Sequence, residues 1–160
     1  MNTTYVAIIF VAFGVSSCAS NPDRMALGAS RQQVVAQFGT PTAAYVLPQG
    51  ERLQYSRQPA GRQVYDLDFD AAGHLVSARQ MLTEAQFAKV QVNTWTAADV
   101  ERAFGRPAQI GQVYSFKGPI WTYRYEVVSF HKLFHVFLDA QGVVRRTQIT
   151  DEVPIRFHLP

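Results

Sequence analysis

One short pattern occurs twice in this chain of 160 residues, and it limits what the chain can fold into. Residues 30–41 read SRQQVVAQFGTP, and residues 96–107 read TAADVERAFGRP. Each copy begins with a hydroxyl residue, has an acceptor three positions later and ends in Gly-x-Pro. This is the pattern of a helix with a capping box and a glycine stop. The sequence therefore predicts two short helices of one design, 66 positions apart (96 − 30 = 66).

Stretches of alternating apolar and polar residues follow each of these helices, as expected of half-buried strands. An Asp-x-x-Gly turn at 70–73 recurs at 139–142, which is 69 positions later (139 − 70 = 69). The change from 66 to 69 places a three-residue insertion between the second helix and its strands. The predicted strands cover residues 52–57, 63–70, 74–82, 121–129, 133–138 and 143–149.

These elements predict an α+β fold made of two tandem repeats. In each repeat, one or two short helices would pack on a three-stranded antiparallel meander. The first repeat is expected at residues 23–82 and the second at 83–150, with residues 151–160 as a tail. A helical turn at 22–27 and a helix at 83–90 would precede the two capped helices.

The N-terminal segment carries the most specific signal for location. Residues 5–15 form an unbroken apolar run. It is shorter than the roughly 20 residues that span a bilayer, and it fits the apolar segment of a secretory signal, about 7–15 residues. Small residues then lead to Cys18, the single cysteine of the chain. In an exported protein, a lone cysteine is free, linked to another molecule or chemically modified.

The four residues at 15–18, Val-Ser-Ser-Cys, resemble the lipobox of bacterial lipoproteins. The resemblance implies that residues 1–17 are a lipoprotein signal peptide and that the Cys18 thiol carries a diacylglycerol, with its amino group acylated as well. Three acyl chains make a durable membrane anchor. Residues 18–22 would then be a short tether.

Two details of this signal affect its interpretation. The residue after the cysteine is Ala19 rather than Asp, and by resemblance to the lipoprotein sorting rule this implies passage to the outer membrane. Residues 1–4 contain no Lys or Arg, although lipoprotein signals usually begin with one. An ordinary signal peptide or an uncleaved anchor is the alternative.

The charge of the chain argues against nucleic-acid binding. The net charge is +3, and its basic residues are scattered rather than gathered in a run. A protein that binds nucleic acid normally shows a concentrated basic stripe. A weak attraction to anionic surfaces such as phospholipid head groups stays open. No cofactor motif is present, and the oligomeric state cannot be read from the sequence.

Two groups of residues invite a chemical role, and neither pattern favours one. Asp66 and Asp68 should lie on one strand face about 7 Å apart, where they could do acid–base work or form a charge ladder on an open sheet. The ladder is the preferred interpretation. His131 and His135 have a helical metal-binding spacing, but in a strand they would be ~13 Å apart. The sequence therefore predicts no catalytic residue and no metal site.

The second repeat offers a candidate surface for a partner. If its aromatic residues alternate into the core, the opposite face carries Arg124, Leu133, His135 and Phe137. Exposed aliphatic and aromatic side chains beside an arginine suggest a contact site for protein or lipid. The alternative is that the first repeat or the tail covers this face.

The capped helix followed by a meander with an Asp-x-x-Gly turn resembles the BamE (SmpA/OmlA) lipoprotein family. Residues 30–41 and 96–107 resemble its helix motif, and residues 64–73 and 133–142 resemble its strand and turn. The tandem arrangement is also similar to the β-lactamase-inhibitor-protein (BLIP-like) fold. The family's assembly subunit usually has one such unit, whereas this chain has two.

What the resemblance implies is a lipoprotein anchored in the outer membrane and facing the periplasm. We expect a non-catalytic protein-binding module with an envelope protein as its partner, as an accessory of outer-membrane β-barrel protein assembly. Inhibition or capture of a secreted hydrolase is the alternative. An enzyme acting on envelope material is a third hypothesis, for which only the aspartates and scattered histidines are available.

Overall fold

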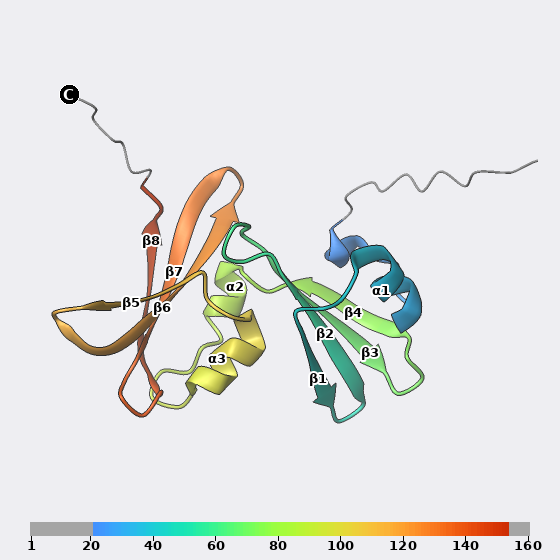
Figure 1. Ribbon diagram of the computed structural model, residues 1–160, viewed down its shortest axis with the longest axis horizontal. Helices are drawn as coiled ribbons and strands as arrows, with labels where there is room; N and C mark the ends of the chain where they lie inside the picture. The colour runs from blue at the N-terminus through green and yellow to red at the C-terminus, as the bar shows by residue number, and fades with distance from the viewer. Residues whose placement is uncertain (1–20, 154–160) are drawn as a thin grey trace, which may run out of the picture.

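A computed structural model describes residues 21–153, in which two helical segments followed by four strands occur twice along the chain (Figure 1). The sequence signals for Cys18 and for most of the tail lie outside these residues. In chain order the elements are η1 Pro22–Arg24, α1 Arg31–Phe38, β1 Ala43–Leu47, β2 Gly50–Ser56, β3 Val64–Asp70, β4 Leu75–Gln80, α2 Glu84–Phe87, α3 Ala97–Phe104, β5 Gln109–Val113, β6 Phe116–Val127, β7 Phe130–Leu138 and β8 Val144–Asp151.

The two capped helices form where the sequence predicts them. In α1, the Ser30 side chain accepts from the Gln33 backbone N–H, and the Gln33 side chain accepts from the Ser30 N–H in return. In α3, Thr96 and Asp99 form the same capping box. Both helices end at a glycine with positive φ, a conformation that side-chain-bearing residues rarely adopt. The local sequence is sufficient to set both ends of each helix.

The sheets are larger than predicted. Strands β1–β4 form one four-stranded antiparallel sheet in sequence order, and β5–β8 form another. The expectation of three-stranded meanders is therefore wrong. The missed strands, β1 and β5, are five-residue edge strands that bury no residue fully. Because they form mainly by backbone pairing with β2 and β6, their side chains carry little periodic signal.

Three boundaries also differ from the expectations. The turn between β6 and β7 lies at residues 128–129, because Val127 pairs with Phe130, and not near His131 and Lys132. Strand β8 extends through Asp151, so the expected tail begins inside the sheet. The predicted helical turn at 22–27 is shorter, a 3₁₀ turn at Pro22–Arg24. Pro22 suits the first position of this turn, and the turn ends at Met25, whose backbone is extended.

The elements stack in layers (Figure 1). Helix α1 lies on the outer side of the β1–β4 sheet, and α2 and α3 lie between the two sheets. Contacts confirm that α3 touches both sheets. The Gln54 side chain on β2 donates to the Arg102 carbonyl of α3, and Phe104 of α3 meets Phe134 of β7 edge to face. The first sheet is thus covered on both faces, whereas the second is covered on one.

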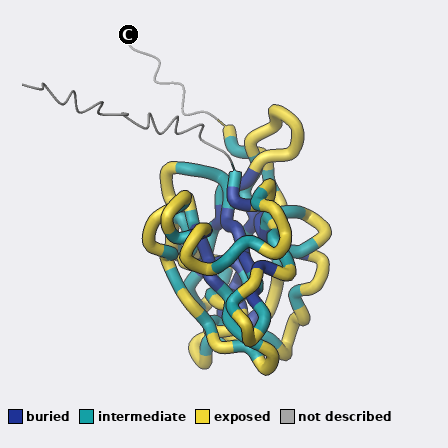
Figure 2. Tube along the Cα trace, turned by 90° about the vertical axis from the view of Figure 1, so that its right-hand side faces the viewer, coloured by how far each residue is buried: buried dark blue, intermediate teal, exposed yellow. Residues whose placement is uncertain are grey.

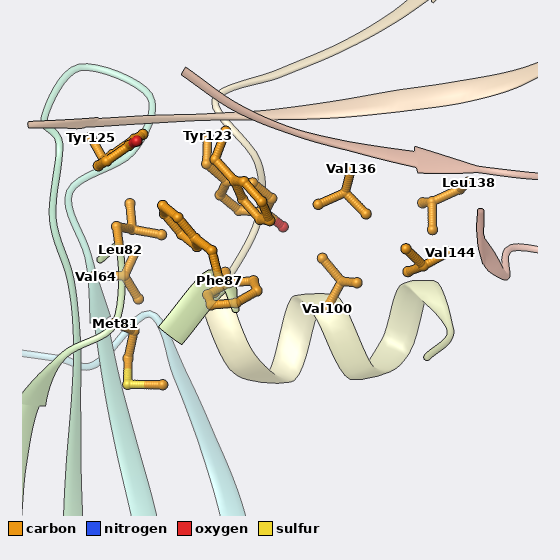
Figure 3. Packing of buried hydrophobic residues seen from close by; sticks show 12 residues of the cluster. Val64, Met81, Leu82, Phe87, Val100, Tyr123, Tyr125, Val136, Leu138 and Val144 are labelled. Carbon is orange, nitrogen blue, oxygen red and sulfur yellow. The ribbon is translucent and has the colours of Figure 1, made fainter. Parts of the chain in front are cut away.

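The core consists of two clusters of buried side chains. The smaller cluster joins Val34 of α1 to one face of the first sheet. The larger cluster packs α2 and α3 on the second sheet and also takes in Val64, Met81 and Leu82 from one end of the first sheet (Figure 3). Phe87 of α2 stacks on Phe134 with ring centroids 3.9 Å apart. This shared cluster joins the halves of the chain.

Each half also contains the same set of local contacts. Asp70 Oδ1 accepts from two backbone N–H groups in its turn, and Asp139 Oδ1 does the same in the corresponding turn. The Tyr55 hydroxyl donates to the carbonyl of Gly39, the glycine that ends α1. Tyr123 donates in the same way to Gly105, the glycine that ends α3. Each tyrosine therefore ties a helix end to its sheet.

Candidate functional site

Alternation along β6 and β7 separates two faces of the second sheet, as the sequence predicts. The core face holds fully buried aromatic and aliphatic residues, namely Tyr123, Tyr125, Phe134, Val136 and Leu138. The opposite face, which we call the outer face, carries the four predicted contact residues Arg124, Leu133, His135 and Phe137. Neither α2 nor α3 covers it (Figure 1). The structure brings these four residues together on one surface but places them in different environments.

His135 lies half-buried between two hydroxyl groups. Its Nδ1 is 3.0 Å from Thr122 Oγ1 on β6, and its Nε2 is 2.9 Å from Thr150 Oγ1 on β8. Burial lowers the pKa of His135 below its ordinary value of 6.5, so the ring is neutral at pH 7. One ring nitrogen donates and the other accepts in that state. Both nitrogens are engaged, which suits a structural role better than proton transfer.

Phe137 lies on the outer face but is only 5% exposed. Phe116, at the start of β6, meets its ring edge to face at 5.2 Å. The Arg146 guanidinium of β8 lies 3.8 Å from the ring centroid. The expectation of an exposed Phe137 is therefore wrong, because Phe116 and Arg146 cover its ring. The sequence pattern identified its face but could not identify its cover.

Arg124 and Leu133 line a hollow of about 300 Å³ at one end of the outer face. Arg124 Nη2 lies 2.6 Å from a carboxylate oxygen of Glu152, and Arg62 from the first half of the chain lies 2.7 Å from the other oxygen. The remaining lining residues come from both halves of the chain: Pro59, Ala108, Gln109 and Thr122. The hollow thus combines an aliphatic side chain, a proline and an ion pair.

Glu152 is the functional candidate that the sequence analysis missed. Burial pushes its pKa up, but hydrogen bonds from Arg62 and Arg124 outweigh this and hold the pKa below its ordinary value. It is therefore ionised at neutral pH. The residue fell in the expected tail, and only the extension of β8 brings it to the hollow. An acidic residue three positions after the predicted strand at 143–149 was the one available signal.

Asp66 and Asp68 do not lie on an open sheet surface, so that expectation is wrong. They lie on the face of the first sheet that α3 covers, and Asp66 is 0% exposed. Arg52 Nη1 is 2.9 Å from Asp66 Oδ2, and Arg52 Nε is 2.6 Å from Asp68 Oδ1. Arg79 also pairs with Asp68 at 2.8 Å. The predicted charge ladder of aspartates and arginines exists, but Asp66 is buried.

Burial raises the pKa of Asp66 to about 6, while Arg52 and a hydrogen bond from Gln54 act in the opposite direction. A raised carboxylate pKa is one mark of a catalytic acid, provided that the group reaches a cleft. A groove of about 550 Å³ does lie next to this face, between β1, β2 and the end of α3. Gln54 and Glu101 line it, whereas Asp66 and Asp68 are not among its lining residues.

Metal ligands and membrane-spanning helices are the remaining features to consider. Within residues 21–153 there is no group of three or more His, Cys, Asp or Glu side chains placed to hold a metal ion. His135 lies on strand β7 as the sequence predicts, and His131, which the sequence placed in the turn before this strand, lies on β7 as well. In the same range, no helix has the length and apolar character needed to cross a bilayer.

Comparisons with known proteins add little to this geometry. No protein-family model and no curated protein matches the sequence. Among solved structures, the chain is similar to the crystal structure of a DUF4309 family protein (YjgB) from Bacillus subtilis. The match has 14% identity and a TM-score of 0.32, and it covers 78% of this chain and 79% of that one.

Proposed function

We propose that this protein is an outer-membrane lipoprotein, anchored through Cys18 and facing the periplasm, that binds an envelope protein without catalysing a reaction. The outer face of the second sheet is the proposed contact surface. The observation that carries this proposal is the hollow where Arg124 and Leu133 meet Pro59 and Glu152. By family resemblance, we propose that the partner belongs to the machinery that assembles outer-membrane β-barrel proteins.

The chemistry of the hollow supports a protein ligand. Leu133 and Pro59 supply apolar area, and Arg124 is a residue type enriched at protein interfaces. The Nε atoms of Arg62 and Arg124 are buried and have no hydrogen-bond partner among residues 21–153.

A non-catalytic role is supported by how the reactive side chains are used. Asp68 is held by Arg52 and Arg79, and both nitrogens of His135 face hydroxyl groups. An enzyme would need a nucleophile and a base meeting in a pocket. The described residues engage these groups in structural contacts instead.

We also propose that the two halves are tandem copies of one unit of a helix and a four-stranded meander. The shared capping boxes, the paired turn aspartates and the tyrosine bonds to Gly39 and Gly105 support this. The offsets agree as well, since Tyr123 follows Tyr55 by 68 positions (123 − 55 = 68), between the 66 of the helices and the 69 of the turns.

The contact surface can be tested by photocrosslinking in native envelopes, with the reactive group placed at Leu133. We expect one predominant protein adduct, and we expect Arg124→Ser to reduce it. Val76 on β4 is a matched control, because it is an exposed aliphatic residue of the other sheet. If the adduct persists unchanged in Arg124→Ser and also forms from position 76, the outer face is not the contact surface.

The identity of the adduct separates the two partner classes. A β-barrel assembly component supports the accessory role, and a secreted hydrolase whose activity falls on binding supports the inhibitor alternative.

The anchor has its own test, which is metabolic labelling with a palmitate analogue. We expect the label to be lost in Cys18→Ser, and its retention would contradict acylation of that thiol.

A further inference from the structure

The hairpin between β6 and β7 ends in exposed apolar side chains. Residues 126–131 are consecutively exposed, and this stretch includes Val127, Val128 and Phe130, which we call the apolar tip. Val128 is 90% exposed and Phe130 is 69% exposed. Scattered exposed apolar residues are common, but three within four positions at the end of a projecting hairpin form a patch.

The backbone at the tip strengthens this point. Val127 pairs with Phe130, so Val128 and Ser129 form a two-residue turn. Val128 has φ of 57°, in the left-handed region. Such turns favour Asn, Asp or Gly, and a β-branched residue there is strained by roughly 1–3 kcal/mol. The turn geometry does not favour valine at this position, so we infer that its apolar side chain has a role of its own.

The tip lies at the same end of the molecule as both ends of the described chain. Figure 1 shows the β6–β7 hairpin, the end of β8 and η1 on one side, with the β1–β2 hairpin on the opposite side. Figure 2, turned by 90°, again shows an exposed loop beside the two points where the described chain ends. The Glu152 N–H donates to the His131 carbonyl at 2.9 Å, which fixes the end of β8 beside the hairpin.

The distance along the chain to the anchor is short. Only Ala19, Ser20 and Asn21 separate Cys18 from Pro22, where η1 begins. A chain of four peptide steps spans at most ~14 Å. An acylated Cys18 would therefore hold the η1 end of the molecule close to the bilayer, and this is the end that carries the apolar tip.

We propose that the apolar tip inserts into the interfacial region of the phospholipid bilayer, as a second membrane contact beside the lipid anchor. This inference rests on the anchor in the proposed function. Valine and phenylalanine side chains bury their area among acyl chains, and a single hairpin of this size reaches the head-group boundary without crossing the bilayer. Two contacts would fix the orientation of the protein, with the β1–β2 hairpin directed away from the membrane.

The charges at the base of the hairpin are compatible with this contact. Lys132 pairs with Asp151, and Glu152 is held by Arg62 and Arg124. Glu126 accepts a hydrogen bond from Gln63. Because these charges are largely balanced, the tip requires an apolar interface rather than a strongly anionic surface. A protein partner at the tip is the competing occupant, and the experiment below distinguishes it.

The experiment compares two engineered tryptophans in the full chain. Val128→Trp places the probe at the tip, and Val46→Trp places it on the β1–β2 hairpin, where the valine is 88% exposed. The protein is bound to vesicles of phosphatidylethanolamine with a minor share of phosphatidylglycerol, with and without brominated acyl chains, which quench tryptophan in the bilayer. We expect about a two-fold loss of the added emission for Val128→Trp and none for Val46→Trp.

The outcomes separate the tip from the anchor. Quenching of Val128→Trp alone supports insertion. If brominated lipid quenches neither probe while the protein still sediments with the vesicles, insertion is overturned and the anchor stays intact. If mass spectrometry finds no acyl group on Cys18 but Val128→Trp is quenched, the anchor fails and insertion stands. A photocrosslinker at position 128 tests the protein occupant in native envelopes, and a predominant protein adduct there, together with unquenched Val128→Trp in vesicles, also overturns insertion.

A second variant tests the energetics without a probe at the turn. Phe130→Ser removes the largest apolar side chain of the tip and leaves the strained turn unchanged. In the Cys18→Ser background, which lacks the acyl chains, we expect about tenfold weaker sedimentation with the same vesicles. Val46→Ser is the matched control and should change nothing. Equal loss in both variants would contradict a specific role for the tip.

Discussion

Two faces of this protein occupy corresponding places in its two sheets. In the first sheet, Gln54 pairs across the strands with Asp66, on the face that α3 covers. In the second sheet, Thr122 pairs with His135 at the matching positions, on the face that no helix covers. At these matching positions the covered face holds a fully buried aspartate, whereas the open face holds a neutral histidine. A carboxylate on the covered face is the reverse of what solvent exposure alone would favour.

The difference indicates what each face is for. The charges beneath α3 are paired within the protein, since Arg52 lies beside two carboxylates and Gln54 donates to both Asp66 and the Arg102 carbonyl. The open face keeps apolar area available, with Leu133 beside Arg124. We interpret the first as an internal interface between the two halves. We interpret the second as an interface awaiting an external partner.

The sharpest test of the internal interface is to remove its central cation. Arg52→Ala leaves Asp66 buried without a positive partner, so we expect the free energy of unfolding to fall by roughly 3–5 kcal/mol. Arg79→Ala is the control, because that arginine is half-exposed and pairs with Asp68 alone. It should cost about 1 kcal/mol or less. Urea unfolding measures both, and equal losses would show that Arg52 has no special role.

The pH dependence of stability gives the second test. The folded pKa of Asp66 is about 6, above the ordinary 3.8, so the folded state binds this proton more tightly. Its contribution to stability is then complete below about pH 4 and is lost as the pH rises through about 6, by on the order of 2–3 kcal/mol. Asp66→Asn should therefore become more stable relative to the parent protein between pH 4 and 7.

A control of opposite sign is available in α3. Hydrogen bonds from the backbone and side chain of Thr96 lower the pKa of Asp99, so its contribution appears as the pH rises. Asp99→Asn should lose stability relative to the parent protein as the pH rises through the acid range. A stability difference for Asp66→Asn that stays constant from pH 4 to 7 would exclude a raised pKa at that residue.

The third and smallest effect compares matched tyrosines. Tyr123 donates to Gly105, which is buried, whereas Tyr55 donates to Gly39, which is exposed. Tyr123→Phe leaves a buried carbonyl without its donor and should cost about 1–2 kcal/mol. Tyr55→Phe should cost about half as much, because water can replace the hydroxyl. Thermal unfolding of the pair measures this, and a larger loss at Tyr55 would reverse the comparison.

Local chemistry made part of this protein predictable from its sequence. The ends of α1 and α3 follow from Ser30, Thr96 and their glycines, and the tight turns follow from Asp70 and Asp139, because each signal acts within a few residues. The inward set of β6 and β7 followed from alternation. Strands β1 and β5 were missed since pairing with a neighbour, rather than their own pattern, makes them strands.

The candidate surface was predictable only in part. Alternation placed Arg124, Leu133, His135 and Phe137 on one face, but Glu152 was missed and Phe137 was expected to be exposed. Both errors have one cause, which is that the cover and the rim of a face come from other strands. Residue 146 covers Phe137, and the extension of β8 delivers Glu152. Both effects come from β8, which is distant in sequence from Arg124 and from the start of the outer face.

By itself, the sequence determined the two capped helices and the repeated turns, because these depend on neighbouring residues. The tertiary structure alone decided which sheet face would be buried. Helix α3 lies between the sheets, so it closes Asp66 off from water and leaves the outer face of the second sheet open. Packing between segments far apart in the chain makes that choice, since either face could have been covered by a helix.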